Sequence, residues 1–189
     1  MEGFLVSTGV VALAEIGDKT QLLALLLAAK YRKPVPIILG ILVATLLNHA
    51  VAGAVGAWLA VAIGPAAMRW ILGLSFIAMA VWMLVPDKTE GLDEAPPRFG
   101  VFIATLVAFF VVEIGDKTQI ATVALAAKYT PLAGVVLGTT FGMMLANVPA
   151  VLLGEVAARK LPMKLVHGIA AAVFLLLGIA ALLGIGSLD

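Results

Sequence analysis

The chain has 189 residues, of which 63% are hydrophobic and 12% are charged, and its mean hydropathy is +1.16. Soluble domains contain about 45–50% apolar residues, and a domain of this size must expose much of its surface, so a water-soluble fold is excluded. The net charge of +1 says nothing about partners, but the sequence has no basic patch for binding nucleic acid. The absence of cysteine excludes disulfides, thiolate metal sites and a cysteine nucleophile.

Six apolar segments follow one another along the chain. Hydropathy places them at about 4–29, 34–64, 66–85, 99–127, 131–158 and 162–185. A helix that crosses a bilayer needs about 20 apolar residues, so each segment is long enough to span. The sequence therefore predicts an all-α integral membrane protein with six transmembrane helices.

The first and fourth segments carry the same motif. Glu-Ile-Gly-Asp-Lys-Thr-Gln occurs at residues 15–21 and again at 113–119, an offset of 98 that also aligns many other residues. Because each repeat holds three spans, an odd number, the second must enter the membrane from the opposite side, as in many secondary transporters. The predicted parts are repeat 1 (1–86), a linker (87–98) and repeat 2 (99–189).

The positive residues of the loops predict the orientation of the chain. One side of the membrane would hold Lys30, Arg32, Lys33, Lys88, Arg98, Arg159, Lys160 and Lys164, and the other only Arg69 and Lys128. Cytoplasmic loops carry an excess of Lys and Arg. The linker is therefore predicted to be cytoplasmic, with both termini on the periplasmic side.

Each motif lies near the middle of its predicted span, where a charged side chain is costly and is a functional candidate. On a continuous helix, Glu15 and Asp18 share one face and Lys19 can pair with Glu15. Gln21 would extend the carboxylate side, whereas Thr20 would point elsewhere. The same reasoning applies to the second copy, with Glu113, Asp116, Lys117, Thr118 and Gln119.

The charges and ligand types of the two motifs favour a divalent cation. Four carboxylates and two lysines give −4 + 2 = −2, which would balance one such ion. Carboxylate and amide oxygens are hard ligands, suited to Ca²⁺, Mg²⁺ or Mn²⁺. The predicted metal ligands are Glu15, Asp18, Gln21, Glu113, Asp116 and Gln119. No resident cofactor is predicted, and the cation would be a transported substrate.

Five further residues near the motifs are candidates for shaping or completing the site. Asn48 and His49 lie midway along the second segment, and the offset aligns His49 with Asn147. Each could supply a ligand or simply hydrogen-bond between helices. Gly17 and Gly115 leave two alternatives open: a helix break that presents backbone carbonyls, or the close approach of a neighbouring helix.

Other interpretations of the acidic cluster are a purely orienting buried ion pair in each motif, an exporter of small basic molecules, an intramembrane enzyme and a structural membrane subunit. A basic substrate would leave the two lysines unexplained. An enzyme would need a nucleophile with a base, and no Ser-His or metal-His arrangement accompanies Thr20 and Thr118. An identical seven-residue cluster in both repeats exceeds what helix packing requires.

The doubled Glu-x-Gly-Asp-Lys-[Ser/Thr] signature, the six spans and the short linker resemble uncharacterised protein family 0016, cation exchangers that include a Golgi protein needed for glycosylation. The resemblance covers essentially the whole chain. It implies transport of Mn²⁺ or Ca²⁺ coupled to H⁺, with Mn²⁺ export or loading of a compartment in bacterial and cyanobacterial relatives. The direction predicted for this chain is export from the cytoplasm. The cation-handling residues it implies are Glu15, Asp18, Lys19, Thr20, Glu113, Asp116, Lys117 and Thr118. The compact length indicates a prokaryotic member, in the bacterial inner membrane.

Overall fold

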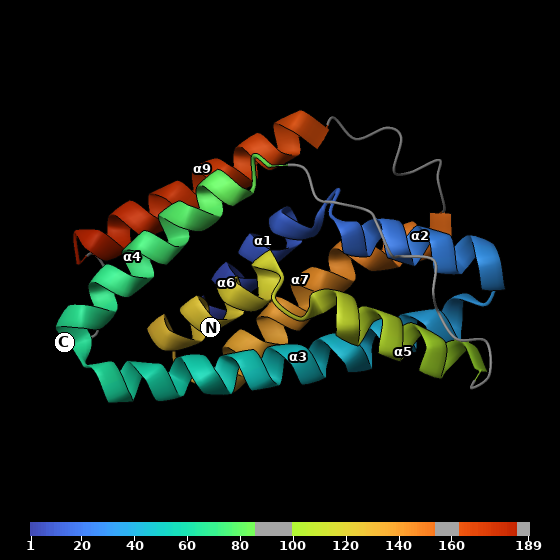
Figure 1. Cartoon of the computed structure of the whole chain (residues 1–189), viewed down its shortest axis with the longest axis horizontal. Coiled ribbons are helices and arrows are strands. Elements are labelled where there is room, and N and C mark those ends of the chain that lie inside the picture. The colour runs from blue at the N-terminus through green and yellow to red at the C-terminus, as the bar shows by residue number, and fades with distance from the viewer. Residues whose placement is uncertain (86–99, 154–162, 185–189) are drawn as a thin grey trace.

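The structure, a computed structural model, describes residues 1–85, 100–153 and 163–184, and the regular secondary structure in these residues is all α-helix (Figure 1). The helices are α1 (Glu2–Glu15), α2 (Lys19–Tyr31), α3 (Pro34–Ile63), α4 (Pro65–Trp82), α5 (Gly100–Glu113), α6 (Lys117–Lys128), α7 (Leu132–Leu153) and α9 (Met163–Leu182). The predicted all-α class is confirmed. The predicted linker at 87–98 and the basic residues Arg159 and Lys160 lie outside the described residues.

Three helical stretches are long and apolar enough to cross a membrane: Pro34–Ile63, Leu132–Leu153 and Lys164–Leu182. Ala66–Trp82 and Gly100–Glu113 are shorter apolar helices. Each of the segments 4–29 and 99–127 consists of two helices joined at the motif, so the helix break is the one of the two alternatives for Gly17 and Gly115 that occurs. The apolar spans confirm an integral membrane protein.

The two breaks have the same backbone geometry. Gly17 and Gly115 have φ values of 84° and 76°, a left-handed conformation that glycine adopts without a Cβ penalty. Asp18 and Asp116 follow with extended backbones and are the N-cap residues of α2 and α6. A Cβ built on Gly115 would meet nothing within 4 Å, so this glycine is required for conformation and not for close packing.

The helices of each repeat pack mainly against helices of the other. α1 lies on α7, and α3 lies on α5. A Cβ built on Gly138 would lie 2.5 Å from the carbonyl oxygen of Phe4, and one built on Gly40 would lie 2.9 Å from that of Phe102. Since the offset of 98 relates Phe4 to Phe102 and Gly40 to Gly138, the same backbone contact occurs twice.

Both of these helix pairs run parallel. Their contacts advance together along the two partners: Phe4–Gly138 and Thr8–Gly142 for α1 and α7, and Gly40–Phe102 and Asn48–Phe110 for α3 and α5. α3 and α7 run in opposite directions along the long axis (Figure 1). α4 and α9 form an antiparallel pair, in which the rings of the equivalent residues Phe76 and Phe174 lie 6.2 Å apart. This arrangement brings both motif breaks to the centre of the molecule.

Candidate metal centre

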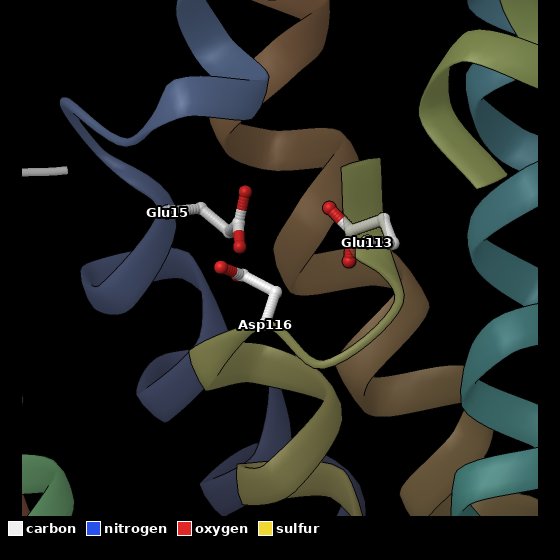
Figure 2. A group of neighbouring side chains, drawn as sticks. All are labelled: Glu15, Glu113 and Asp116. Atoms are coloured by element: carbon white, nitrogen blue, oxygen red, sulfur yellow. The ribbon is translucent and has the colours of Figure 1, made fainter. Parts of the chain in front are cut away.

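Three carboxylates from the two motifs converge at the centre of the molecule. Glu15 ends α1, Glu113 ends α5 and Asp116 begins α6, and each is at most 1% exposed. One oxygen from each lies within 4.8 Å of the others. Figure 2 shows the three side chains pointing toward one another. The two copies of the motif, 98 residues apart in sequence, therefore form one acidic group, which we call the carboxylate group.

Two threonines hold the carboxylate group. The Thr20 hydroxyl donates to Glu15 Oε2, and Thr118 Oγ1 lies 3.3 Å from Glu113 Oε2 and 3.4 Å from Asp116 Oδ2. Thr20 would point away from the acids only on a continuous helix, and the break at Gly17 instead brings its hydroxyl to Glu15. The remaining oxygen of each glutamate, Oε1, is buried and has no hydrogen-bond partner in the described part of the chain.

Those two buried oxygens fit a cation. Buried polar atoms nearly always have a partner, so a carboxylate oxygen without one indicates an ion or water that completes it. Oxygen ligands from several carboxylates are what Ca²⁺ and Mn²⁺ take in proteins. Because Glu15 and Glu113 each end a helix, the negative end of the helix dipole adds to the attraction for positive charge.

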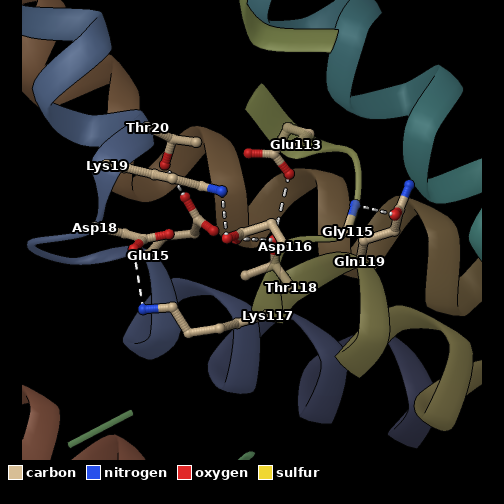
Figure 3. A network of polar contacts seen from close by, with 10 residues as sticks. All are labelled: Glu15, Asp18, Lys19, Thr20, Glu113, Gly115, Asp116, Lys117, Thr118 and Gln119. Carbon is tan, nitrogen blue, oxygen red and sulfur yellow. Dashed lines mark hydrogen bonds and ion pairs between the residues drawn. The ribbon is translucent and has the colours of Figure 1, made fainter. Parts of the chain in front are cut away.

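Two ion pairs link the repeats across the centre. Lys19 Nζ lies 2.8 Å from Asp116 Oδ1, and Lys117 Nζ lies 3.0 Å from Asp18 Oδ1 (Figure 3). The pairing of Lys19 with Glu15 that a continuous helix would allow does not occur. The break at Gly17 removes the helical register that this pairing requires, and Lys19 at the start of α2 instead reaches Asp116 at the N-terminus of α6. The offset of 98 relates the two ion pairs, so in each pair the lysine of one motif binds the aspartate of the other motif.

The two ion pairs differ in their surroundings. The side chain of Lys19 is 22% exposed, whereas that of Lys117 is 2% exposed. Asp116 belongs to the carboxylate group and Asp18 does not. Two identical motifs thus occupy unequal environments.

The two predicted glutamine ligands bind the backbone at the breaks. The Gly17 N–H donates to Gln21 Oε1 over 3.0 Å, and the Gly115 N–H donates to Gln119 Oε1 over 2.8 Å. Gln21 Nε2 also donates to the Ala146 carbonyl oxygen in α7. Sequence reasoning missed this role, although the four-residue spacing from glycine to glutamine in both motifs was a signal for it. A ligand role for the glutamines stays a prediction.

The polar residues predicted beside the motifs are buried, but they do not belong to the carboxylate group. Asn48 Nδ2 donates to the Phe110 carbonyl oxygen, and Asn147 Nδ2 donates to that of Met143. Both ring nitrogens of His49 and the amide oxygen of Asn147 are buried with no hydrogen-bond partner among the residues described. Their part in cation binding stays a prediction.

Comparisons with known proteins match nearly the whole chain. A family model described as "Divalent cation/proton antiporter GDT1" matches residues 3–91 and 101–187, one stretch for each copy of the motif, which indicates an internal repeat. A Vibrio cholerae protein named "Putative manganese exporter" is 52% identical over 176 residues, covering 93% of this chain and 88% of that protein.

Plant relatives are more distant. The Arabidopsis thaliana proteins "GDT1-like protein 5" and "Protein PAM71-homolog, chloroplastic" are each 28% identical over 97% of this chain, covering 96% and 60% of their own lengths. No solved structure matches the chain.

Proposed function

Because the chain belongs to the divalent cation/proton antiporter family GDT1, we propose that its carboxylate group binds Mn²⁺ and exports it from the cytoplasm in exchange for protons. The observation that carries this proposal is the convergence of three buried carboxylates, two of them with an oxygen that lacks a partner. The choice of Mn²⁺ is supported by the similarity to the Vibrio cholerae protein. As a member of a transporter family, the chain is not an enzyme.

The exchange follows from the chemistry of carboxylates. Glu15, Glu113 and Asp116 can hold either a divalent cation or protons, and occupancy by one opposes the other. Export then requires that the group face the two sides of the membrane alternately. Asp18 is equivalent to Asp116, and we expect it to join the glutamates in the opposite state. Gln21 and Gln119 remain predicted ligands.

For the membrane topology we propose two inverted repeats, 1–86 and 99–189, joined by a cytoplasmic linker at 87–98. α1 with α2, and α5 with α6, would each form one interrupted span, giving six crossings in a bacterial inner membrane. The parallel pairing of α1 with α7 and of α3 with α5 supports this arrangement, since equivalent helices then run in opposite directions. Interrupted helices with a site at the repeat interface are common in secondary transporters.

The proposal is tested by ion flux in proteoliposomes. Purified protein should move Mn²⁺ when a pH gradient is imposed, and Glu113→Gln or Asp18→Asn should lower the rate by at least about tenfold, because both acids lie in the motif machinery. Glu2→Gln is the matched control: it removes an exposed carboxylate from the start of α1 and should leave the flux unchanged. Normal Mn²⁺ flux in Glu113→Gln would show that the site is wrongly placed.

The same assay identifies the ion. Flux of Mn²⁺, Ca²⁺ and Mg²⁺ should be compared at equal concentrations, and each with and without the pH gradient. Mn²⁺ should be moved fastest, and its flux should fall when the gradient is collapsed. Flux of Ca²⁺ without flux of Mn²⁺ would replace the proposal with a Ca²⁺ exchanger, and flux that ignores the pH gradient would contradict proton exchange.

A further inference from the structure

The unequal ion pairs of Lys19 and Lys117 show that two identical motifs are used differently in this structure. Lys19 Nζ lies 2.8 Å from an oxygen of Asp116, which is part of the carboxylate group. Lys117 Nζ lies 3.0 Å from Asp18, which is outside that group. Lys19 therefore places its charge on a carboxylate that faces the two glutamates.

A divalent cation in the carboxylate group would compete with the Lys19 ammonium. Both are attracted to the carboxylate of Asp116, and they would repel each other at the short distance imposed by shared ligation. Lysine carries a point charge on a flexible four-carbon stem, so it can move without moving its helix. The 22% exposure of the Lys19 side chain shows that protein does not enclose it completely.

Lys117 has no such freedom. Its side chain is 2% exposed, and its partner Asp18 is also 2% exposed. Separating a buried ion pair leaves an uncompensated buried charge and is strongly destabilising. Lys117 therefore has the character of a fixed connection between α6 and the first motif.

We propose that Lys19 is a tethered counter-ion, which occupies Asp116 while no divalent cation is bound and leaves it when a cation enters, whereas Lys117 stays on Asp18. This rests on the proposed function, since it takes the carboxylate group as the cation site. The return of Lys19 to Asp116 would weaken cation binding and so promote release.

The inference can be tested on the unmodified protein by lysine acylation. Detergent-purified chain is treated briefly with an amine-acylating reagent, with and without Mn²⁺ at constant pH, and the modified peptides are quantified by mass spectrometry. Mn²⁺ should raise acylation of Lys19 severalfold, because its ammonium leaves the ion pair, and should leave Lys117 poorly acylated. Lys30, exposed at the other end of α2, is the internal control and should not change.

The outcomes separate this inference from the proposed function. Mn²⁺ binding without a rise in Lys19 acylation would overturn the counter-ion role and leave the cation site standing. Absence of any Mn²⁺ binding to the unmodified chain would overturn both. The rise should disappear in the double variant Glu15→Gln/Glu113→Gln, and a rise that persists there would show that Mn²⁺ acts elsewhere.

Equilibrium binding of Mn²⁺ gives a second, independent readout. Lys19→Gln should bind Mn²⁺ roughly tenfold more tightly, because no ammonium must be displaced, and Lys117→Gln should not bind more tightly. Lys30→Gln and Lys128→Gln remove the same charge from the distal ends of the same two helices and control for net charge. Equal tightening in Lys19→Gln and Lys117→Gln, or weaker binding in Lys19→Gln, would contradict the proposal.

Discussion

Gln21 and Gln119 occupy equivalent positions in the two motifs but have different surroundings. Each accepts the N–H of the glycine at its own break. Gln21 is 7% exposed and also donates to the Ala146 carbonyl oxygen of α7, so it connects the first break to the second repeat. Gln119 is only partly buried. The amide side chain therefore stabilises a broken helix in both repeats and joins the two repeats at one of them.

We expect Gln21→Ala to destabilise the protein more than Gln119→Ala. A typical intramolecular hydrogen bond contributes about 0.5–1.5 kcal/mol, so losing two bonds in a buried place should cost about 1–3 kcal/mol. Losing the single bond of Gln119 near the surface should cost about 1 kcal/mol or less. Thermal unfolding in detergent, followed by the fluorescence of the three tryptophans, measures the difference. Equal stability of both variants with lost Mn²⁺ binding would instead favour the predicted ligand role.

A residue of the site could be predicted from the sequence when its role follows from its own position in the span, and not when its role depends on a partner in the other repeat. The acids were found because a charge in mid-span is costly wherever it points. The partner of Lys19 was not predicted, because the spacing of a continuous helix places it beside Glu15 and only the break places it beside Asp116. Long-range pairing between repeats leaves no periodic signal in the sequence.

At the scale of helices, glycine allows the two repeats to approach until their backbones touch. Gly138 and Gly142 of α7 face the carbonyl oxygens of Phe4 and Thr8 in α1, at 2.5 Å and 2.6 Å from a built Cβ. α1 ends at Glu15, so this packing also positions one carboxylate of the site. The four-residue spacing of Gly134, Gly138 and Gly142 in the sequence is typical of close helix packing in lipid, and Pro34 and Gly64 lie at the two ends of α3.

The break inside the first and fourth segments was not predictable in the same way. Gly17 and Gly115 were compatible with a break or with a close neighbour, and both are common uses of glycine in membrane helices. The positive φ at both positions shows that the helix is broken there. A single residue's backbone angle is determined by the packing around it, which hydropathy does not encode.

Gly138→Ala should destabilise the α1–α7 interface. The added methyl would meet a backbone oxygen that cannot rotate away, and overpacking of this kind costs about 1–3 kcal/mol. The displacement of α1 should also weaken Mn²⁺ binding through Glu15. Gly134→Ala in the same helix is the matched control, because a Cβ there meets nothing within 4 Å, and it should be neutral or slightly stabilising. Similar unfolding temperatures for the two variants would contradict the close contact.

At the scale of the whole molecule, equivalent residues meet each other where the two repeats join. Phe76 contacts Phe174, and the pairs of Lys19 with Asp116 and Lys117 with Asp18 are exchanged by the same offset. Contacts between equivalents occur around a two-fold axis that relates two repeats. The unequal exposure of the two lysines is a departure from that symmetry at the site itself. Such asymmetry is expected of an inverted-repeat transporter in which the two repeats adopt different conformations and interchange them between the two states.

The inverted arrangement predicts on which side of the membrane each part of the chain lies. Since the wild-type chain has no cysteine, single cysteines can be labelled without background. With three crossings per repeat, Glu2→Cys and Asp189→Cys should both react with a membrane-impermeant maleimide in intact spheroplasts, whereas Asp93→Cys should react only after the membrane is opened. Labelling of Asp93→Cys from outside together with Glu2→Cys would show an even number of crossings in the first repeat. In that case the two motifs would enter the membrane from the same side. The proposal that the carboxylate group is exposed to each side of the membrane in turn requires opposite orientations, so it would be contradicted.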